Sequence, residues 1–226
     1  MIPQIETTKK DVIKKSSRAH VVYKTSDGKR VPGTTTITGL LNKPQLVSWA
    51  NKLGLEGIDS AKYTDEAAAV GTLAHALVQA DLTGEPVNLR LYSPQQVDLA
   101  ENAVLSWFEW KKQHKLEVIF VERQMVSDKM RYGGTLDCYC KLDGRPTLLD
   151  FKTGKAIYEE YFVQLAAYAA LLREKGYQVE ETRILRIGRD ETEGFEERKV
   201  MDTRKWFEIF ENLLNVYYLK KELGWK

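Results

Sequence analysis

Asp137, Asp150 and Lys152 are charged residues placed where strand geometry would bring them together. Between the two acids lies Asp143-Gly144, a dipeptide that favours a two-residue hairpin turn. That turn would set Asp137 opposite Asp150 on neighbouring antiparallel strands, where like charges repel. Lys152 would lie on the same face, because side chains alternate along a strand. The pattern therefore predicts a cluster of acids that holds one lysine.

A second hairpin would add Glu122 to this cluster. If residues 128–131 form a four-residue loop, Glu122 lies opposite Asp137. Converging carboxylates are what Mg²⁺ needs, since it prefers oxygen ligands. The alternative is a solvated ladder of cross-strand ion pairs. The apolar residues around Asp150 favour a strand buried on both faces, where a charge needs a function.

Three polar side chains on predicted helices could join the acids. His75 follows Gly71 by one helical turn, so we expect the glycine to leave space beside the imidazole. Gln164 and Tyr168 are also one turn apart and could reach the cluster. The ordinary alternatives are a packed or surface histidine and a local contact between the glutamine and the tyrosine.

The elements that must position these residues follow from periodicity and turn signals. A hairpin is expected first, then three helices, a meander of three antiparallel strands, a helix, two strands and a closing helix. This order predicts an α/β fold. The expected hairpin strands cover 19–25 and 34–38; the helices 44–54, 65–82, 94–114, 159–175 and 203–223; the strands 116–126, 133–142, 147–152, 182–187 and 195–200.

Composition limits the class of protein. The chain has 226 residues, 43% hydrophobic and 29% charged, without a linker-like stretch, so we expect one ordinary globular domain. No apolar run is long enough for a membrane span, and the first residues do not resemble a signal peptide, so we expect a soluble protein without a membrane partner. Cys138 and Cys140 are expected to be reduced packing residues. A net charge of +2 neither requires nor excludes a phosphate-binding surface.

Taken in order, these residues form a recognisable set of motifs. GTLAH at 71–75, Glu122, GTLD at 134–137, LDFKTG at 149–154 and QLAAY at 164–168 resemble the RecB-type branch of the PD-(D/E)XK nuclease superfamily. The segment 34–50 is also similar to the early part of small phage and mitochondrial exonucleases of this type. The motifs cover residues 71–168.

The resemblance implies a fold and a metal site. The fold would be a restriction-endonuclease-like α/β core, whose central mixed sheet contains the antiparallel meander and is flanked by helices. Residues 65–190 would form this core within a single nuclease domain 1–226, with an extension at 1–64 and a closing strand and helix at 191–226. The implied metal ligands are His75, Asp137, Asp150 and the backbone carbonyl of Phe151. Mg²⁺ is the expected ion and Mn²⁺ a substitute; no iron–sulfur cluster is expected, because the chain has only two cysteines.

The same resemblance assigns catalytic roles to Lys152, Asp150, Asp137, Glu122, Gln164 and Tyr168. Lys152 has two possible functions. As a neutral amine it could take a proton from the attacking water, and as an ammonium it could stabilise the negative charge that builds up on the phosphate. The neighbouring acids favour the charged form. Gln164 and Tyr168 would contact Lys152, the water or a phosphate.

These features predict a metal-dependent DNA nuclease, an exonuclease that acts on single strands or on DNA ends. Lys155, Tyr158 and Trp49 are the candidate DNA contacts, and Lys9, Lys10, Lys14, Lys15 and Arg18 would form a basic arm. The expected setting is recombination, repair or replication, with partner proteins, in the cytoplasm of a bacterial or phage-infected cell rather than in the mitochondrial matrix. The chain has no P-loop, so any use of ATP would come from a partner. Two alternatives remain: a non-catalytic DNA-binding subunit and a nuclease that cleaves RNA.

Overall fold

A computed structural model describes residues 21–225 of the chain. The basic arm expected at Lys9–Arg18 lies outside the described residues. The helices are α1 (Thr34–Thr38), α2 (Pro44–Leu55), α3 (Ser60–Thr83), α4 (Pro94–Lys112), α5 (Glu159–Glu174) and α6 (Arg204–Glu222), with a 3₁₀ turn, η1 (Leu89–Leu91). The strands are β1 (Tyr23–Lys24), β2 (Arg30–Val31), β3 (Leu116–Ser127), β4 (Tyr132–Leu142), β5 (Arg145–Thr153), β6 (Glu181–Ile187) and β7 (Phe195–Val200).

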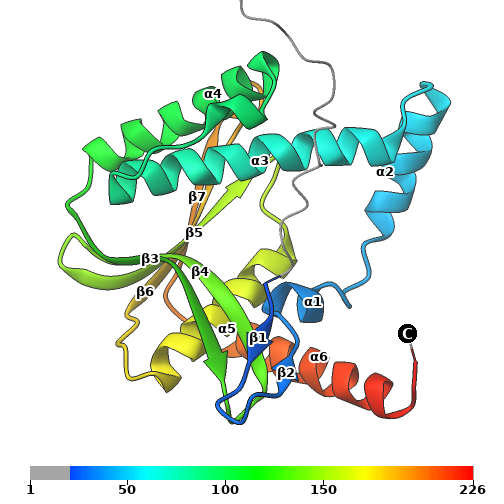
Figure 1. The fold of residues 1–226 in the computed structure, drawn as a ribbon, viewed down its shortest axis with the longest axis vertical. Coiled ribbons are helices and arrows are strands. Elements are labelled where there is room, and N and C mark those ends of the chain that lie inside the picture. Colours follow the sequence, from blue (N-terminus) through cyan, green and yellow to red (C-terminus); the bar gives the residue numbers. More distant parts are fainter. Residues whose placement is uncertain (1–20, 226) are drawn as a thin grey trace, which may run out of the picture.

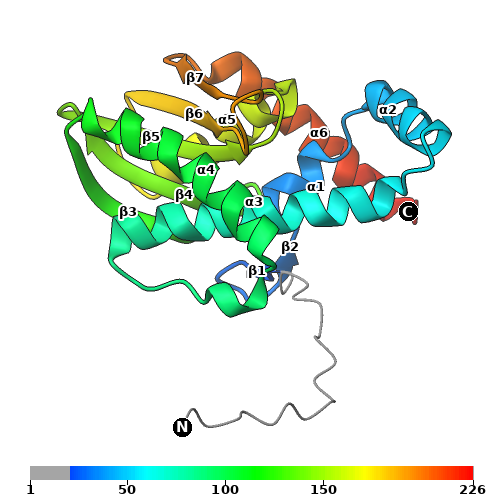
Figure 2. The ribbon, with the colours of Figure 1, turned by 90° about the horizontal axis from the view of Figure 1, so that it is seen from above.

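The main sheet has five strands in the order β3-β4-β5-β6-β7. Only the β5–β6 pair is parallel, and the three other neighbouring pairs are antiparallel. Helices α3 and α4 cover one face of this sheet, and α5 and α6 cover the other (Figures 1 and 2). The predicted α/β class, with a mixed sheet that contains an antiparallel meander and is flanked by helices, is confirmed.

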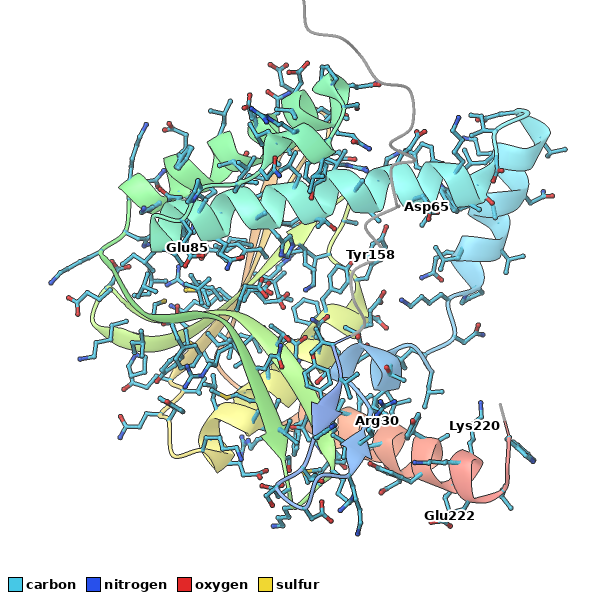
Figure 3. All side chains as sticks on the ribbon, viewed as in Figure 1. Arg30, Asp65, Glu85, Tyr158, Lys220 and Glu222 are labelled. Carbon is cyan, nitrogen blue, oxygen red and sulfur yellow. The ribbon has the colours of Figure 1, made fainter. Side chains whose placement is uncertain are left out.

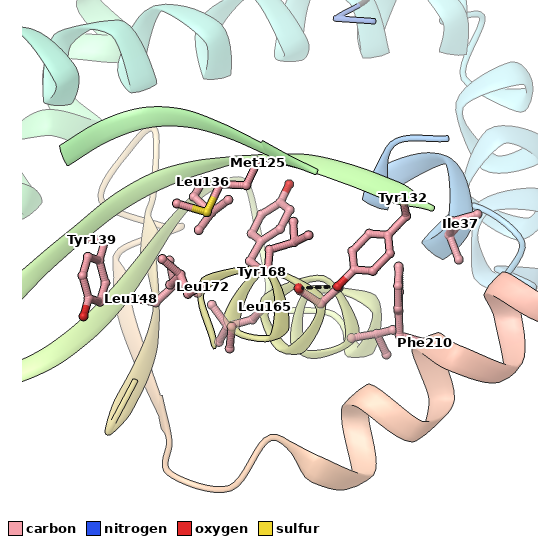
Figure 4. Close-up of a cluster of buried hydrophobic side chains, with 14 of the residues drawn as sticks. Ile37, Met125, Tyr132, Leu136, Tyr139, Leu148, Leu165, Tyr168, Leu172 and Phe210 are labelled. Carbon is pink, nitrogen blue, oxygen red and sulfur yellow. Dashed lines mark hydrogen bonds between the residues drawn. The ribbon is translucent and has the colours of Figure 1, made fainter. Parts of the chain in front are cut away.

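Each face of the sheet carries its own hydrophobic core. On the α5 side the core includes Tyr132, Leu148, Leu165 and Phe210 (Figure 4). Tyr132 donates a hydrogen bond to the Ala167 carbonyl there (2.9 Å). On the α3 side, α3 and α4 pack on Cys138, Cys140, Leu149 and Phe151, with Trp107 and Trp110 buried between them. The polar residues on β4 and β5 therefore lie at the junction of two cores.

The turn between β4 and β5 has the predicted register. Asp143 and Gly144 both have positive φ, 50° and 85°, as the expected hairpin requires. Pairing runs from Leu142↔Arg145 to Cys138↔Leu149 and then ends. The ladder therefore ends one pair before Asp137 and Asp150, so these two acids are not held as a bonded cross-strand pair.

The hairpin between β3 and β4 also has the predicted register near the acids. Arg123 pairs with Leu136 and Val121 with Cys138, so Glu122 lies at the position opposite Asp137. Glu122 itself has φ 48°, which is uncommon for a residue other than glycine. The side-chain pattern changes at this point: Leu136 packs on the α5 side, whereas Cys138 packs on the α3 side. Both strands are irregular where the acids meet.

Two expectations near the N-terminal side are wrong. Residues 34–38, predicted as a strand, form the short helix α1, in which Ile37 is fully buried and the Thr34 hydroxyl donates to the Gly133 carbonyl (3.0 Å). Tertiary contacts outweigh the β propensity of this threonine-rich segment. Helix α3 begins at Ser60 rather than at Asp65, because Asp59 caps it by accepting from the backbone amides of Ala61 and Lys62.

Among the described helices, none has both the length and the apolar composition that crossing a membrane requires.

Candidate active site

One histidine and two acids from three different elements meet beside the sheet. His75 of α3, Glu122 of β3 and Asp137 of β4 each offer one ligand atom, and these atoms lie within 4.8 Å of one another. The His75 Nδ1 is 3.9 Å from Asp137 Oδ2. One imidazole nitrogen and two carboxylates form a ligand set that suits Mg²⁺ or Mn²⁺. The described residues therefore include a possible site for a divalent metal.

The register of α3 on the sheet brings His75 to this point. Val70, Leu73, Ala74 and Val78 fix that register because they are buried against the sheet and α4. The expectation that Gly71 leaves space for the imidazole is wrong. A Cβ at Gly71 would lie 2.5 Å from the Thr153 hydroxyl oxygen, so the Thr153 side chain at the end of β5 occupies the space beside the glycine.

Asp137 links the cluster to β5. Its Oδ2 accepts a hydrogen bond from the Phe151 backbone amide (2.8 Å). This bond lies just beyond the last pair of the β4–β5 ladder. The Asp137 carboxylate therefore accepts the Phe151 amide hydrogen bond at the point where the two strands stop pairing. The bond ties Asp137 to the segment that carries Asp150 and Lys152.

Asp150 is buried, with only 1% of its surface exposed. Burial raises the pKa of its carboxyl to about 6; Lys152 opposes this shift and the charge of Asp137 adds to it. Its Oδ2 forms an ion pair with Lys152 Nζ. Yet neither carboxylate oxygen accepts a hydrogen bond of normal geometry from the described residues. A buried carboxylate in this condition is costly to the fold and ready to accept a cation.

Lys152 is held between that acid and an aromatic ring. Its ammonium nitrogen lies 5.1 Å from the centre of the Tyr161 ring, within cation–π range. Burial and the charge of Glu160 raise the pKa of Tyr161 to about 12, so the ring stays neutral. Tyr161 was not among the predicted site residues. Its position one turn into α5, after Tyr158, was the available signal.

Gln164 and Tyr168 contact each other as the helical spacing suggested. The Gln164 side-chain amide donates to the Tyr168 hydroxyl (2.9 Å). Tyr168 extends from α5 toward β4 (Figure 4), and a Cβ at Gly134 would lie 2.4 Å from its ring. Burial raises the pKa of Tyr168 well above its usual range, and the charges of Asp150 and Asp137 add to the effect. The charges of both acids therefore act on the Tyr168 phenol.

A second tyrosine near the acids was missed by the sequence reasoning. Tyr23 of β1 lies on Gly133 of β4, where a Cβ would be 2.5 Å from its ring. Burial raises the pKa of Tyr23, and the Glu122 charge contributes to the same shift. Consecutive glycines within a strand signal close approach by another group, and this was the clue that could have indicated Tyr23.

The predicted DNA contacts lie outside the acid cluster. Tyr158 is 40% exposed, with its ring edge-on to Tyr161, and its label lies between α3 and α1 in the view of Figure 3. Lys155 is exposed in the turn after β5. Trp49 of α2 is half-buried and packs edge-on against Tyr63 of α3. All three remain predictions.

Comparisons with known proteins give distant similarity only. No family model and no curated protein matches the chain. Among solved structures, an alkaline exonuclease (LHK-Exo) from Laribacter hongkongensis is 12% identical with a TM-score of 0.42, over 68% of this chain and 79% of that one. Its complex with dAMP gives 14% and 0.37, over 68% and 84%, and SSO0001 gives 14% and 0.30, over 67% and 74%. Because each of these three TM-scores is below 0.5, the proposed function rests on the residues of this chain.

Proposed function

We propose that the protein is a metal-dependent nuclease of the PD-(D/E)XK superfamily, of the RecB type, that hydrolyses phosphodiester bonds in DNA. One observation carries the proposal. Asp137 of the His75, Glu122 and Asp137 cluster accepts a hydrogen bond from the Phe151 amide, and the residue before Phe151 is the buried Asp150 that pairs with Lys152. A surface ladder of ion pairs does not explain a carboxylate that is 1% exposed and accepts no hydrogen bond of normal geometry from the described residues.

The ligands that would hold the ion are His75, Asp137 and Asp150, with Glu122 as a further candidate and the Phe151 carbonyl as a backbone ligand. A bound Mg²⁺ or Mn²⁺ would supply Lewis-acid activation of the phosphate and of water. The burial of Asp150 and the mixed nitrogen and oxygen ligands both fit such an ion.

The other residues act through charge and position. Lys152 is held by the Asp150 carboxylate and the Tyr161 ring, two partners that both favour a cation. We therefore assign Lys152 to stabilising the negative charge that builds up on the phosphate, rather than to taking a proton. Gln164 donates a hydrogen bond to the Tyr168 hydroxyl, which would orient the water or a phosphate oxygen.

The proposed substrate is single-stranded DNA, or a DNA end opened to a single strand, cleaved as by an exonuclease. Exposed Tyr158 could stack on an unpaired base, and base stacking contributes roughly 1 to 3 kcal/mol per ring. Trp49 and Lys155 are the further proposed contacts, and the basic segment 9–18 would follow the backbone. We also propose that the protein is a single nuclease domain that acts in the cytoplasm. Its role would be in recombination, repair or replication, together with partner proteins.

A cleavage assay tests the activity and the polymer together. End-labelled single-stranded DNA, blunt duplex DNA and RNA of one sequence would be incubated with the protein, with and without Mg²⁺. A circular single strand would separate an exonuclease from an endonuclease, since only the second can open it. Metal-dependent cleavage of the linear DNA strand, with the circle left intact, is the expected result.

Paired variants show whether the activity belongs to this site. Glu122→Gln should reduce cleavage, whereas Glu117→Gln, which neutralises an exposed acid on the same strand, should not. Asp150→Asn should abolish cleavage. Binding of DNA without cleavage under every metal condition would instead favour the non-catalytic subunit, and preference for the RNA would favour the ribonuclease.

A further inference from the structure

The β1–β2 hairpin supplies a side chain to the margin of the candidate active site. The Gly133 amide donates to the Pro32 carbonyl (2.9 Å), which ties the chain just after the hairpin to β4. The Tyr23 ring lies directly on the Gly133 backbone, in a space that a Cβ would fill. Because the backbone of β4 forms this surface, the ring has a fixed position.

The Tyr23 hydroxyl pairs with the Thr135 hydroxyl. Their oxygens are 2.9 Å apart, and both residues are half-buried. Each hydroxyl has one hydrogen, and the pair uses only one of the two for its mutual bond. The pair therefore keeps a second hydroxyl hydrogen that it can donate to a third group.

This hydroxyl pair lies beside the acid cluster. Gly133 and Thr135 alternate onto one face of β4, and Asp137 is two residues beyond Thr135, where the side-chain pattern of the strand changes. Thr135 is then one side-chain repeat, roughly 7 Å, from Asp137. On the neighbouring strand β3, Thr135 pairs with Gln124, which is two residues from Glu122. The Glu122 charge also contributes to the raised pKa of Tyr23. A neutral hydroxyl pair with one hydrogen to donate thus lies next to the group of acids.

We propose that the Tyr23 and Thr135 hydroxyls bind a phosphate oxygen of the nucleotide next to the cleaved linkage. The inference rests on the proposed nuclease function and adds a subsite to it. A DNA strand that places one phosphate at the acid cluster must place the next phosphate about one nucleotide away. A hydroxyl donates a stronger hydrogen bond to a charged phosphate oxygen than to a neutral acceptor. Hydroxyls also carry no positive charge that would compete with a metal for the acids.

Removing either hydroxyl tests this subsite without removing its framework. Tyr23→Phe keeps the ring on Gly133, and Thr135→Val keeps the shape of the side chain. Each should weaken binding of a short DNA strand to the Asp150→Asn protein in Mg²⁺ by roughly ten-fold, which corresponds to about 1.4 kcal/mol. In the cleavage-competent protein each should raise KM more than it lowers kcat. Thr135→Ser should restore most of the binding.

Tyr139→Phe is the matched control. Tyr139 is on the same strand, but its hydroxyl donates to the Gln178 carbonyl (2.5 Å) and its ring packs in the core on the α5 side. This variant should lose some stability and keep the wild-type affinity for DNA.

Neutral linkages in the DNA identify the contact from the substrate side. A methylphosphonate would replace one of the two phosphates that flank the cleaved linkage. On the strand whose methylphosphonate replaces the phosphate that Tyr23 contacts, the Tyr23→Phe variant should bind with the same affinity as the protein that has Tyr23. An undiminished loss on both strands would show that Tyr23 only holds the hairpin in place, and unchanged affinity of Tyr23→Phe for ordinary DNA would also overturn the subsite. If the protein binds strands through Tyr23 but never cleaves them, the nuclease function fails while the subsite stands.

Discussion

Asp150→Asn should stabilise the metal-free protein at neutral pH while it abolishes cleavage. Burial raises the pKa of the Asp150 carboxyl from 3.8 to about 6, even though Lys152 pairs with it. Asparagine has the shape of the protonated acid, so it avoids the cost of ionising this group. The difference between a pKa of 3.8 and one of about 6 corresponds to a gain on the order of 3 kcal/mol in the free energy of unfolding.

The gain should depend on pH. Between the ordinary pKa of 3.8 and the folded value of about 6, the folded protein keeps a proton that the unfolded chain has released. The stability of the wild type therefore decreases as the pH rises through this window. The stability of the Asp150→Asn variant should not show this decrease. The difference between the two proteins should be near zero at about pH 4 and reach its full size above about pH 7.

Urea unfolding in the presence of EDTA, at several pH values between about 4 and 8, measures this difference. Added Mg²⁺ should stabilise the wild type more than the variant, because a metal bound only by the folded state adds stability. Asp202→Asn is the control, since Arg204 holds the pKa of that exposed acid low and its neutralisation should bring no gain. If Asp150→Asn were less stable than the wild type at pH 8, or if the difference in their free energies of unfolding did not change with pH, the account of Asp150 would be refuted.

Three further predictions address the metal site, the packing around it and the substrate. His75→Ala should raise the Mg²⁺ concentration for half-maximal cleavage more than it weakens DNA binding; an unmoved midpoint would make His75 a packing residue. Gly134→Ala should lower the free energy of unfolding by about 1–3 kcal/mol and reduce cleavage, because its Cβ would lie 2.4 Å from the Tyr168 ring, whereas Gly54→Ala, with open space around it, should do neither. Tyr158→Ala should slow cleavage of a single strand relative to a blunt duplex, and deletion of residues 1–18 should flatten the salt dependence of binding; equal rates on both substrates, or an unchanged salt slope, would contradict these expectations.

Local signals in the sequence determined most of the secondary structure. A capping box formed by Ser93 and Gln96 starts α4, and Gly84 in the left-handed region ends α3. The Asp143-Gly144 turn determined the register of β4 and β5, since a two-residue hairpin permits one pairing. These features depend on neighbouring residues, and so they can be read from the chain alone.

The same register indicated which acids would approach one another. Glu122 takes the position opposite Asp137 that a four-residue loop implied. The sequence could not show that the β4–β5 ladder ends at Cys138 and Leu149, which leaves Asp137 to accept the Phe151 amide. Where a ladder ends depends on how the sheet twists between its two cores.

Tertiary packing decided the remaining features of the site. The threonine-rich segment 34–38 became a helix because Ile37 is buried in the core and Thr34 bonds to β4. Tyr23 reached the acids from more than 100 residues away along the chain, through a surface left open by Gly133. The burial that raises the pKa of Asp150 likewise comes from the elements packed around β5. Residue types and spacing determined which groups could do chemistry, whereas their distances and desolvation arise only when remote segments exclude water together.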